Sequence, residues 1–104
     1  MIDCRRLAPA GPAPAERIVP EISRFFGIVI SMYFDDHLPP HFHARYGDED
    51  AVIEIDSLNV LRGRLRGRAY ELVGEWAMAH RDELMANWLR ARNRQPLNKI
   101  EPLR

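Results

Sequence analysis

Two short segments in the middle of the chain alternate strictly between apolar and polar residues. In HFHARY (41–46) two aromatic residues and an alanine fall on one side, and two histidines and an arginine fall on the other; AVIEID (51–56) alternates in the same way. Because successive side chains of a strand point to opposite faces of a sheet, the pattern predicts two strands that each bury one face. The intervening GDED has a common length for a hairpin loop, so we expect an antiparallel pair with Tyr46 opposite Ala51.

This register would set acidic side chains opposite the two histidines of the first strand. His43 would face Glu54 and His41 would face Asp56, while Arg45 would have Glu54 diagonally near. Both histidines would then form ordinary cross-strand pairs with acids on the polar face of the sheet. That face is expected to carry Ser31, Tyr33, His41, His43, Arg45, Glu54 and Asp56.

Further strands are expected on both sides of this hairpin. The segment FGIVISMYF (26–34) is rich in β-branched and aromatic residues, which predicts a strand. Its buried face would consist of Ile28, Ile30, Met32 and Phe34. SLNVL (57–61) is expected to turn and to add a short fourth strand, and the two glycines of RGRLRGR (62–68) weaken any regular structure after it.

Apolar residues recur at intervals of three, four or seven from Arg68 onward, which is helical periodicity. The stripe consists of Tyr70, Val73, Ala77, Leu84, Trp88 and Ala91, widened by Leu72, Trp76 and Leu89. We expect either one helix to about Arg92 or two helices with a break between His80 and Asp82, where Asp82 would cap the second. The sequence therefore predicts an α+β fold: a three- to four-stranded antiparallel sheet with one long or two consecutive C-terminal helices packed on one face.

Length and composition describe one small domain of 104 residues. Proline and alanine dominate the start, so we expect residues 1–19 to form a flexible arm and residues 20–104 to form a single α+β domain. The single cysteine, Cys4, excludes an internal disulfide and a multi-cysteine zinc site, and it fits a reducing cytosol. No apolar run reaches the roughly 18 residues of a membrane span, so a cytoplasmic location without membrane contact is expected.

The charges are balanced overall but unevenly distributed. The formal net charge is zero, which gives no overall electrostatic case for binding nucleic acid. Residues 1–61 nevertheless carry ten acidic and five basic side chains, and residues 62–104 carry ten basic and five acidic ones. Such asymmetry is typical of a solvated surface, and it also suits a homodimer, an acidic partner or a basic face for phosphates.

Several motifs resemble domain-of-unknown-function family 4160, a family of small prokaryotic proteins. The resemblance rests on PEISRFFGIVISMYFDDHLPPHFHARYG, followed by AVIEI, EWAMAHRDEL, NW and PLNKIEPL, and it covers roughly residues 20–103. It implies no established activity or cofactor. It does imply a genetic context, because these bacterial proteins are often encoded beside another small protein in an arrangement similar to toxin–antitoxin pairs.

Three of the four histidines lie within HLPPHFH (37–43), which makes this stretch a candidate metal site. Two imidazoles on one strand face, at 41 and 43, are close enough to reach one ion. His37 could add a third nitrogen, and Asp35 or Asp36 a carboxylate. Three protein ligands plus water would form an open site for a divalent transition metal such as zinc.

A second hypothesis gives the same histidines a catalytic role. His41 and His43 would exchange protons during phosphodiester cleavage of RNA, and Arg45 on the same face would stabilise the phosphate. The remaining groups expected to bind phosphate or a partner are Tyr33, Arg62, Arg64, Arg66 and Arg68. The leading expectation is a component of a two-protein module, possessing this polar face as its working surface and a small protein encoded nearby as its partner.

Two further hypotheses involve no chemistry. The polar sheet face and the aromatic helix would dock a partner without catalysis, or His41 and His43 would only make salt bridges with Asp56 and Glu54 beside a turn stiffened by two prolines. The sequence alone does not decide among the metal, catalytic, binding and structural roles of this segment.

Overall fold

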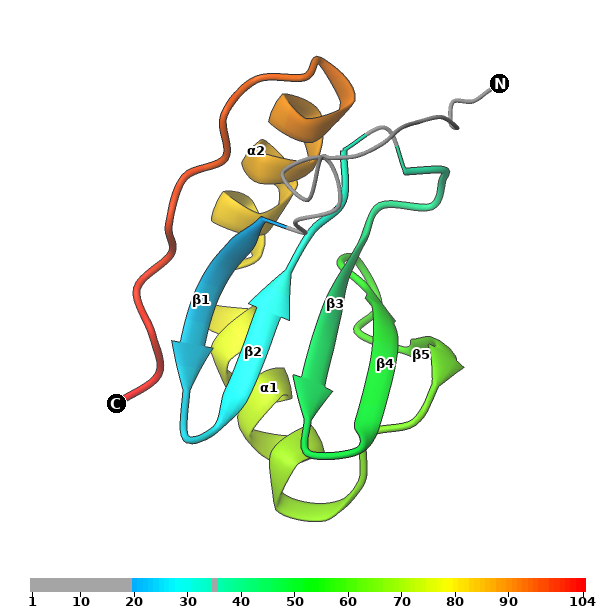
Figure 1. Cartoon of the computed structure of the whole chain (residues 1–104), viewed down its shortest axis with the longest axis vertical. Coiled ribbons are helices and arrows are strands. Elements are labelled where there is room, and N and C mark those ends of the chain that lie inside the picture. Colours follow the sequence, from blue (N-terminus) through cyan, green and yellow to red (C-terminus); the bar gives the residue numbers. More distant parts are fainter. Residues whose placement is uncertain (1–19, 35) are drawn as a thin grey trace, which may run out of the picture.

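The computed structural model describes residues 20–34 and 36–104, so the arm predicted for residues 1–19 lies outside the described residues. Five strands are followed by two helices (Figure 1). The elements are β1 (Glu21–Phe25), β2 (Ile28–Ser31), β3 (His41–Tyr46), β4 (Glu49–Glu54), β5 (Val60–Gly63), α1 (Gly67–Ala79) and α2 (Arg81–Arg92). The α+β class and the two consecutive helices are confirmed, but the sheet has five strands rather than three or four.

Each strand pairs antiparallel with its neighbour in the chain, so the sheet order is β1-β2-β3-β4-β5. The prediction of one strand over residues 26–34 is wrong, because a turn at Phe26 and Gly27 joins β1 to β2. Both turn residues have positive φ, 51° and 81°, as the tight hairpin turns that match strand twist require. β2 ends at Ser31, and Phe34 is therefore 41% exposed rather than buried.

The loop between β3 and β4 is shorter than predicted. Tyr46 pairs with Glu49, so only two residues, 47–48, form the loop instead of four. The pairing is thus shifted by two residues, which keeps every side chain on its predicted face because the side-chain period of a strand is two. Ile53 and Phe42 accordingly lie on the buried face of the sheet.

The shift does change which residues stand opposite one another. His41 pairs with Glu54 and His43 with Val52, so the predicted pairing of the two histidines with Asp56 and Glu54 is wrong. Glu54 instead accepts a hydrogen bond from the hydroxyl of Ser57 at 2.6 Å.

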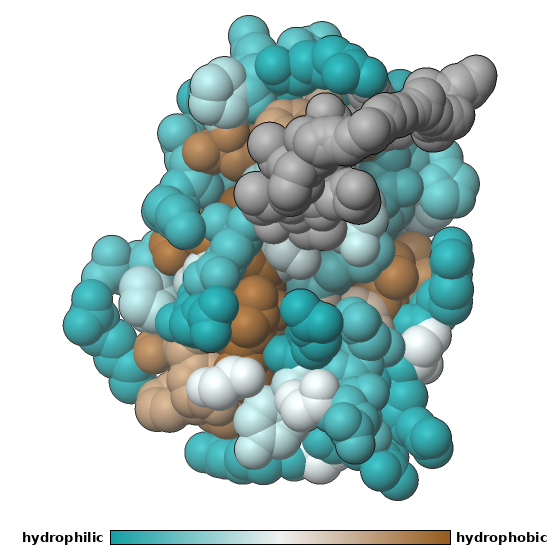
Figure 2. All heavy atoms as spheres, in the orientation of Figure 1, coloured by the Kyte–Doolittle hydropathy of each residue, from teal (hydrophilic) through white to brown (hydrophobic). Residues whose placement is uncertain are grey.

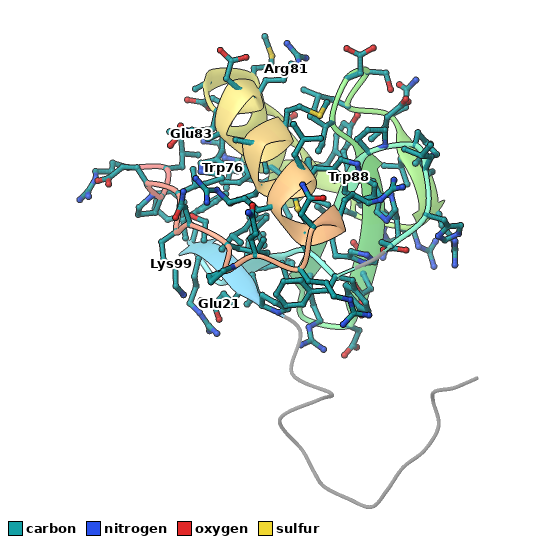
Figure 3. The ribbon with its side chains drawn as sticks, turned by 90° about the horizontal axis from the view of Figure 1, so that it is seen from above. Glu21, Trp76, Arg81, Glu83, Trp88 and Lys99 are labelled. Carbon is teal, nitrogen blue, oxygen red and sulfur yellow. The ribbon has the colours of Figure 1, made fainter. Side chains whose placement is uncertain are left out.

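Both helices lie on the apolar face of the sheet (Figure 1). Trp76 of α1 is fully buried, and its ring centroid lies 5.3 Å from that of Phe25 and 6.1 Å from that of Phe42. Figure 3 looks down on the helices and marks Trp76 on α1 and Trp88 on α2. The buried helical residues are Ala69, Val73, Trp76, Ala77, Leu84, Asn87, Trp88 and Ala91.

The helix prediction needs three corrections. Tyr70 and Leu89 are exposed, because the buried stripes of the two helices pass beside them. His80 forms the junction between the helices: its N–H donates to the carbonyl of Trp76 in α1, and its carbonyl accepts from the N–H of Leu84 in α2. The residue that precedes α2 is therefore His80, and Asp82 lies within the first turn, where its charge suits the helix dipole.

The chain after α2 runs extended beside β1 (Figure 1). The N–H of Ile100 donates to the carbonyl of Ile22 at 2.8 Å, and the indole N–H of Trp76 donates to the carbonyl of Glu101 at 2.8 Å. Ile100 itself is buried in the core. The tail is therefore an integral part of the packed domain.

Hydrophilic residues cover much of the face seen in Figure 2, with smaller hydrophobic patches among them. The two helices of residues 67–79 and 81–92 are shorter and more polar than a bilayer-spanning helix, and no other helix occurs in the described part of the chain.

Candidate metal centre

Asp36 anchors the loop between β2 and β3. Its Oδ1 accepts hydrogen bonds from the backbone N–H and the ring Nδ1 of His37, both at 2.9 Å. Aspartate is frequent in turns because its short side chain can bind nearby backbone N–H groups. The loop continues through a cis peptide bond between Leu38 and Pro39 and returns to the sheet at His41.

The ring of His41 is held at both nitrogens. Nδ1 lies 2.7 Å from the carbonyl oxygen of Pro39, and Nε2 lies 2.8 Å from Oδ2 of Asp36. The residue is only 5% exposed, and its ring packs against Trp88 of α2 with centroids 5.0 Å apart. His41 is therefore buried rather than exposed on the polar face of the sheet, because Trp88 packs against its ring and the loop residues Pro39 and Asp36 bind its two nitrogens.

His43 completes the cluster from the next position on the same face of β3. Its Nε2 lies 3.5 Å from the same carboxylate oxygen of Asp36. The ring of Tyr33 stacks on that of His43, with centroids 4.3 Å apart and an interplanar angle of 29°. His43 is half-buried and therefore has access to solvent that His41 lacks.

Two members of the cluster, Asp36 and His43, have lone pairs that could bind a metal ion at neutral pH. Burial raises the pKa of Asp36, but hydrogen bonds from His37 and His41 outweigh it and lower the pKa to about 2. Burial also lowers the pKa of His43, against the opposing effect of its hydrogen bond to Asp36. Asp36 is thus a carboxylate and His43 a neutral imidazole near pH 7.

The hydrogen bonds of His41 require a positive charge between its Nε2 and Asp36. A carbonyl oxygen can only accept, so Nδ1 must carry a proton. In a neutral ring Nε2 would then have a lone pair facing the carboxylate oxygen at 2.8 Å, and the two would repel. Either a second ring proton or a metal ion removes this repulsion.

Asp36, His41 and His43 each offer one ligand atom, and these three atoms lie within 4.8 Å of one another. The cluster thus contains three of the four residues predicted as metal ligands. The fourth, His37, is 77% exposed and binds the other oxygen of Asp36. Asp35, the other carboxylate considered, lies outside the described residues.

The predicted phosphate-binding residues are divided between two places. Tyr33 and Arg62 line a cavity beside His43. The Nε atoms of Arg64 and Arg66 lie 3.8 and 2.6 Å from Oε2 of Glu49. Nη1 of Arg68 lies 3.4 Å from Oε1 of Glu71. Those three arginines therefore pair with acids away from the cluster.

Arg45 lies two residues beyond His43 and stands opposite Asp50 on β4. It is exposed, and it is not one of the three residues of the cluster. The roles of His41, His43 and Arg45 in RNA cleavage stay predictions, as do the predicted protein partner and the homodimer.

The carbonyl of Pro39 is a functional group that side-chain patterns do not reveal. It fixes the orientation of the His41 ring through a hydrogen bond from Nδ1. The available signal was the PPH sequence itself, because two prolines before a strand constrain where the preceding carbonyl points. The PPH sequence does not identify which ring nitrogen of His41 donates to this carbonyl.

Comparisons with known proteins agree with the family suggested by the motifs. The sequence profile of a family described as "Domain of unknown function (DUF4160)" matches residues 27–89, which include the whole cluster. No curated protein matches the chain, and no solved structure matches it. The comparisons therefore bring no ligand or activity, and the chemistry must be argued from the site.

Proposed function

Because this chain belongs to the DUF4160 family, whose function is unknown, we propose its function from the site itself. The protein binds a divalent transition metal, with zinc as the first candidate, through Asp36, His41 and His43. Imidazole nitrogens and a carboxylate oxygen are ligands that zinc accepts, and the same set also suits iron, nickel and copper. The proposal concerns the bound ion and leaves the reaction open.

The observation that carries the proposal is the orientation of His41. Metal-bound histidines almost always donate their second ring N–H to a carbonyl or carboxylate, which fixes the tautomer and aims the other nitrogen at the metal. His41 has this arrangement, with Nδ1 on the carbonyl of Pro39 and Nε2 toward Asp36. A metal ion would take the place of the proton that otherwise has to lie between Nε2 and the carboxylate.

The spacing of the ligand atoms also fits zinc. Tetrahedral zinc with bonds of about 2.0–2.1 Å keeps its ligand atoms about 3.3 Å apart. Two of the three separations, from Oδ2 of Asp36, are 2.8 Å to His41 and 3.5 Å to His43, on either side of that value. The third, between the nitrogens of His41 and His43, is within 4.8 Å.

Three protein ligands leave a coordination position for water or substrate, as in catalytic zinc sites. When bound, such an ion supplies a Lewis acid and makes a bound water more acidic. The residues of the chain would hold it unequally: His41 is buried against Trp88, whereas His43 is half-buried and restrained by stacking on Tyr33. The open position is therefore expected on the His43 side.

Metal content of the untagged protein, purified after growth with added zinc, tests the proposal. We expect about one zinc ion per chain by mass spectrometry, and loss of most of it in Asp36→Asn and His43→Ala, because each removes one ligand. Asp56→Asn is the matched control, since Asp56 is exposed and is not part of the cluster. His37→Ala should also keep its zinc, because that ring lies outside the cluster.

Circular dichroism of each variant would establish that it is folded before its metal content is compared. Equal zinc in folded Asp36→Asn and Asp56→Asn would refute the ligand assignment. Absence of zinc, iron, nickel and copper from the wild type, together with no uptake on dialysis against each ion, would refute metal binding itself.

A further inference from the structure

A cavity of about 200 Å³ lies beside His43, the one residue of the proposed ligand set that lines it. Its lining comprises Tyr33, His43, Asp50, Ala51, Val52, Arg62 and Gly63. It is smaller than a typical cavity for a drug-sized ligand, which indicates a small molecule or a single chemical group.

The sheet register explains why a hollow forms here. His43 stands opposite Val52, and Val52 stands opposite Arg62, so the three lie in a row across β3, β4 and β5. Directly opposed residues share one face of a sheet, and neighbouring strands are about 4.8 Å apart. The short side chain of Val52 thus forms a floor between two longer ones, whose backbones are about 10 Å apart.

Arg62 differs from the other arginines of the segment 62–68. Arg64, Arg66 and Arg68 each have a carboxylate within 4 Å. For Arg62, residues 20–34 and 36–104 supply no carboxylate within that distance. Its guanidinium is therefore available to a ligand in the cavity that it lines.

We propose that this cavity binds an anionic small molecule whose phosphate or carboxylate group contacts Arg62 while another of its atoms reaches the metal held by Asp36, His41 and His43. The inference rests on the proposed metal site and names the class of ligand for it. A guanidinium is suited to both oxyanions, because its parallel N–H groups match two oxygens at once.

The lining also contains one acid, Asp50, whose negative charge opposes that of Arg62. Arg45 stands opposite Asp50 in the β3–β4 pair, so the two arginines and this acid together leave one positive charge at one end of the cavity. At the other end a divalent ion bound by one carboxylate adds a second, so an anion between them is favoured from both sides.

The protein loaded with Co²⁺ in place of zinc allows the test, because the visible absorption of bound Co²⁺ reports its ligands. Inorganic phosphate and acetate are titrated separately into the wild type, Arg62→Gln and Arg68→Gln. We expect at least one anion to change the spectrum, with an affinity about tenfold weaker in Arg62→Gln, the loss typical of a hydrogen-bonded charge. Arg68→Gln should behave as the wild type, because Arg68 pairs with Glu71 on α1.

The outcomes separate this inference from the metal proposal. The inference alone would be overturned if Co²⁺ binds normally and neither anion changes its spectrum. It would also be overturned if both anions bind with equal affinity to the wild type and to Arg62→Gln. Failure to form any Co²⁺ complex would overturn both. Where binding does depend on Arg62, the anion that binds more tightly to the wild type identifies the group as phosphate or carboxylate.

Discussion

The two carboxylate oxygens of Asp36 have different partners. Oδ1 binds His37 within the loop, whereas Oδ2 faces Nε2 of His41 and of His43. One side chain therefore joins the turn to the strand and supplies the carboxylate of the proposed metal site. Substitution of Asp36 should affect both stability and metal binding, and the two effects can be measured separately in metal-free protein.

The pH dependence of stability tests the ionised state of Asp36. Its folded pKa of about 2 lies below the ordinary value of 3.8, so its contribution is present above pH 3.8 and is lost as the pH falls through about 2. Between pH 4 and pH 2 the metal-free wild type should lose about 1–2 kcal/mol more free energy of unfolding than Asp36→Asn, allowing for partial exposure. Urea unfolding across this pH range measures the difference between the two losses. Equal losses in both proteins would contradict the ionised state of Asp36.

The acid that contacts the two histidines could not be predicted without knowing the loop lengths around β3. Strand alternation was enough to place His41 and His43 on one face. The acid that joins them, however, is Asp36 and not Asp56 or Glu54. Periodicity fixes the face of a residue but not its partner, because a shift of two residues in register leaves the pattern unchanged.

At the scale of the elements, turns were harder to predict than strands and helices. The two helices and three of the five strands follow from their apolar spacing. The β1–β2 turn gave no such signal, since Phe26 has a φ of 51° that phenylalanine rarely adopts. The sequence around it therefore resembled an uninterrupted strand.

Two glycines near β5 offer a matched test of how that strand is attached. Gly63 and Gly67 both have positive φ, 78° and 62°. A Cβ on Gly63 would lie 2.1 Å from the carbonyl oxygen of Asp50, whereas a Cβ on Gly67 would meet nothing within 4 Å. We expect Gly67→Ala to lower the free energy of unfolding by about 1 kcal/mol and Gly63→Ala by about 3 kcal/mol or more, measured by urea unfolding. Equal costs would mean that β5 moves away from β4 without penalty.

One buried amide ties the C-terminal tail to α2. Asn87 of α2 is 1% exposed; its side chain donates to the carbonyl of Asn98 and accepts from its N–H, at 2.8 and 2.9 Å. Asn87→Ala should lower the free energy of unfolding by about 2–3 kcal/mol, because both backbone groups lose their partner. Asn98→Ala keeps those groups and should cost less than about 0.5 kcal/mol. Similar values for the two variants in urea unfolding would show that the tail is held elsewhere.

At the scale of the whole molecule, the cluster of Asp36, His41 and His43 is connected to the core rather than attached to its surface. His41 packs on Trp88 of α2, and α2 is tied to the tail through Asn87. The tail in turn donates from Ile100 to β1. Because the ligands come together only in the folded chain, an ion that binds them favours the folded state as a unit.

Zinc should therefore raise the stability of the entire domain. At a free concentration one hundred times the dissociation constant, binding adds about 2.7 kcal/mol to the free energy of unfolding. For a domain of this size that corresponds to a rise in Tm of about 10–20 °C. Calorimetry with zinc and then with excess chelator should show the rise and its reversal in the wild type and in His37→Ala, whose ring is not among the three ligands. His43→Ala should show neither, because two ligands bind too weakly to shift the folding equilibrium. A zinc-dependent rise that persists unchanged in His43→Ala would place the ion elsewhere in the protein.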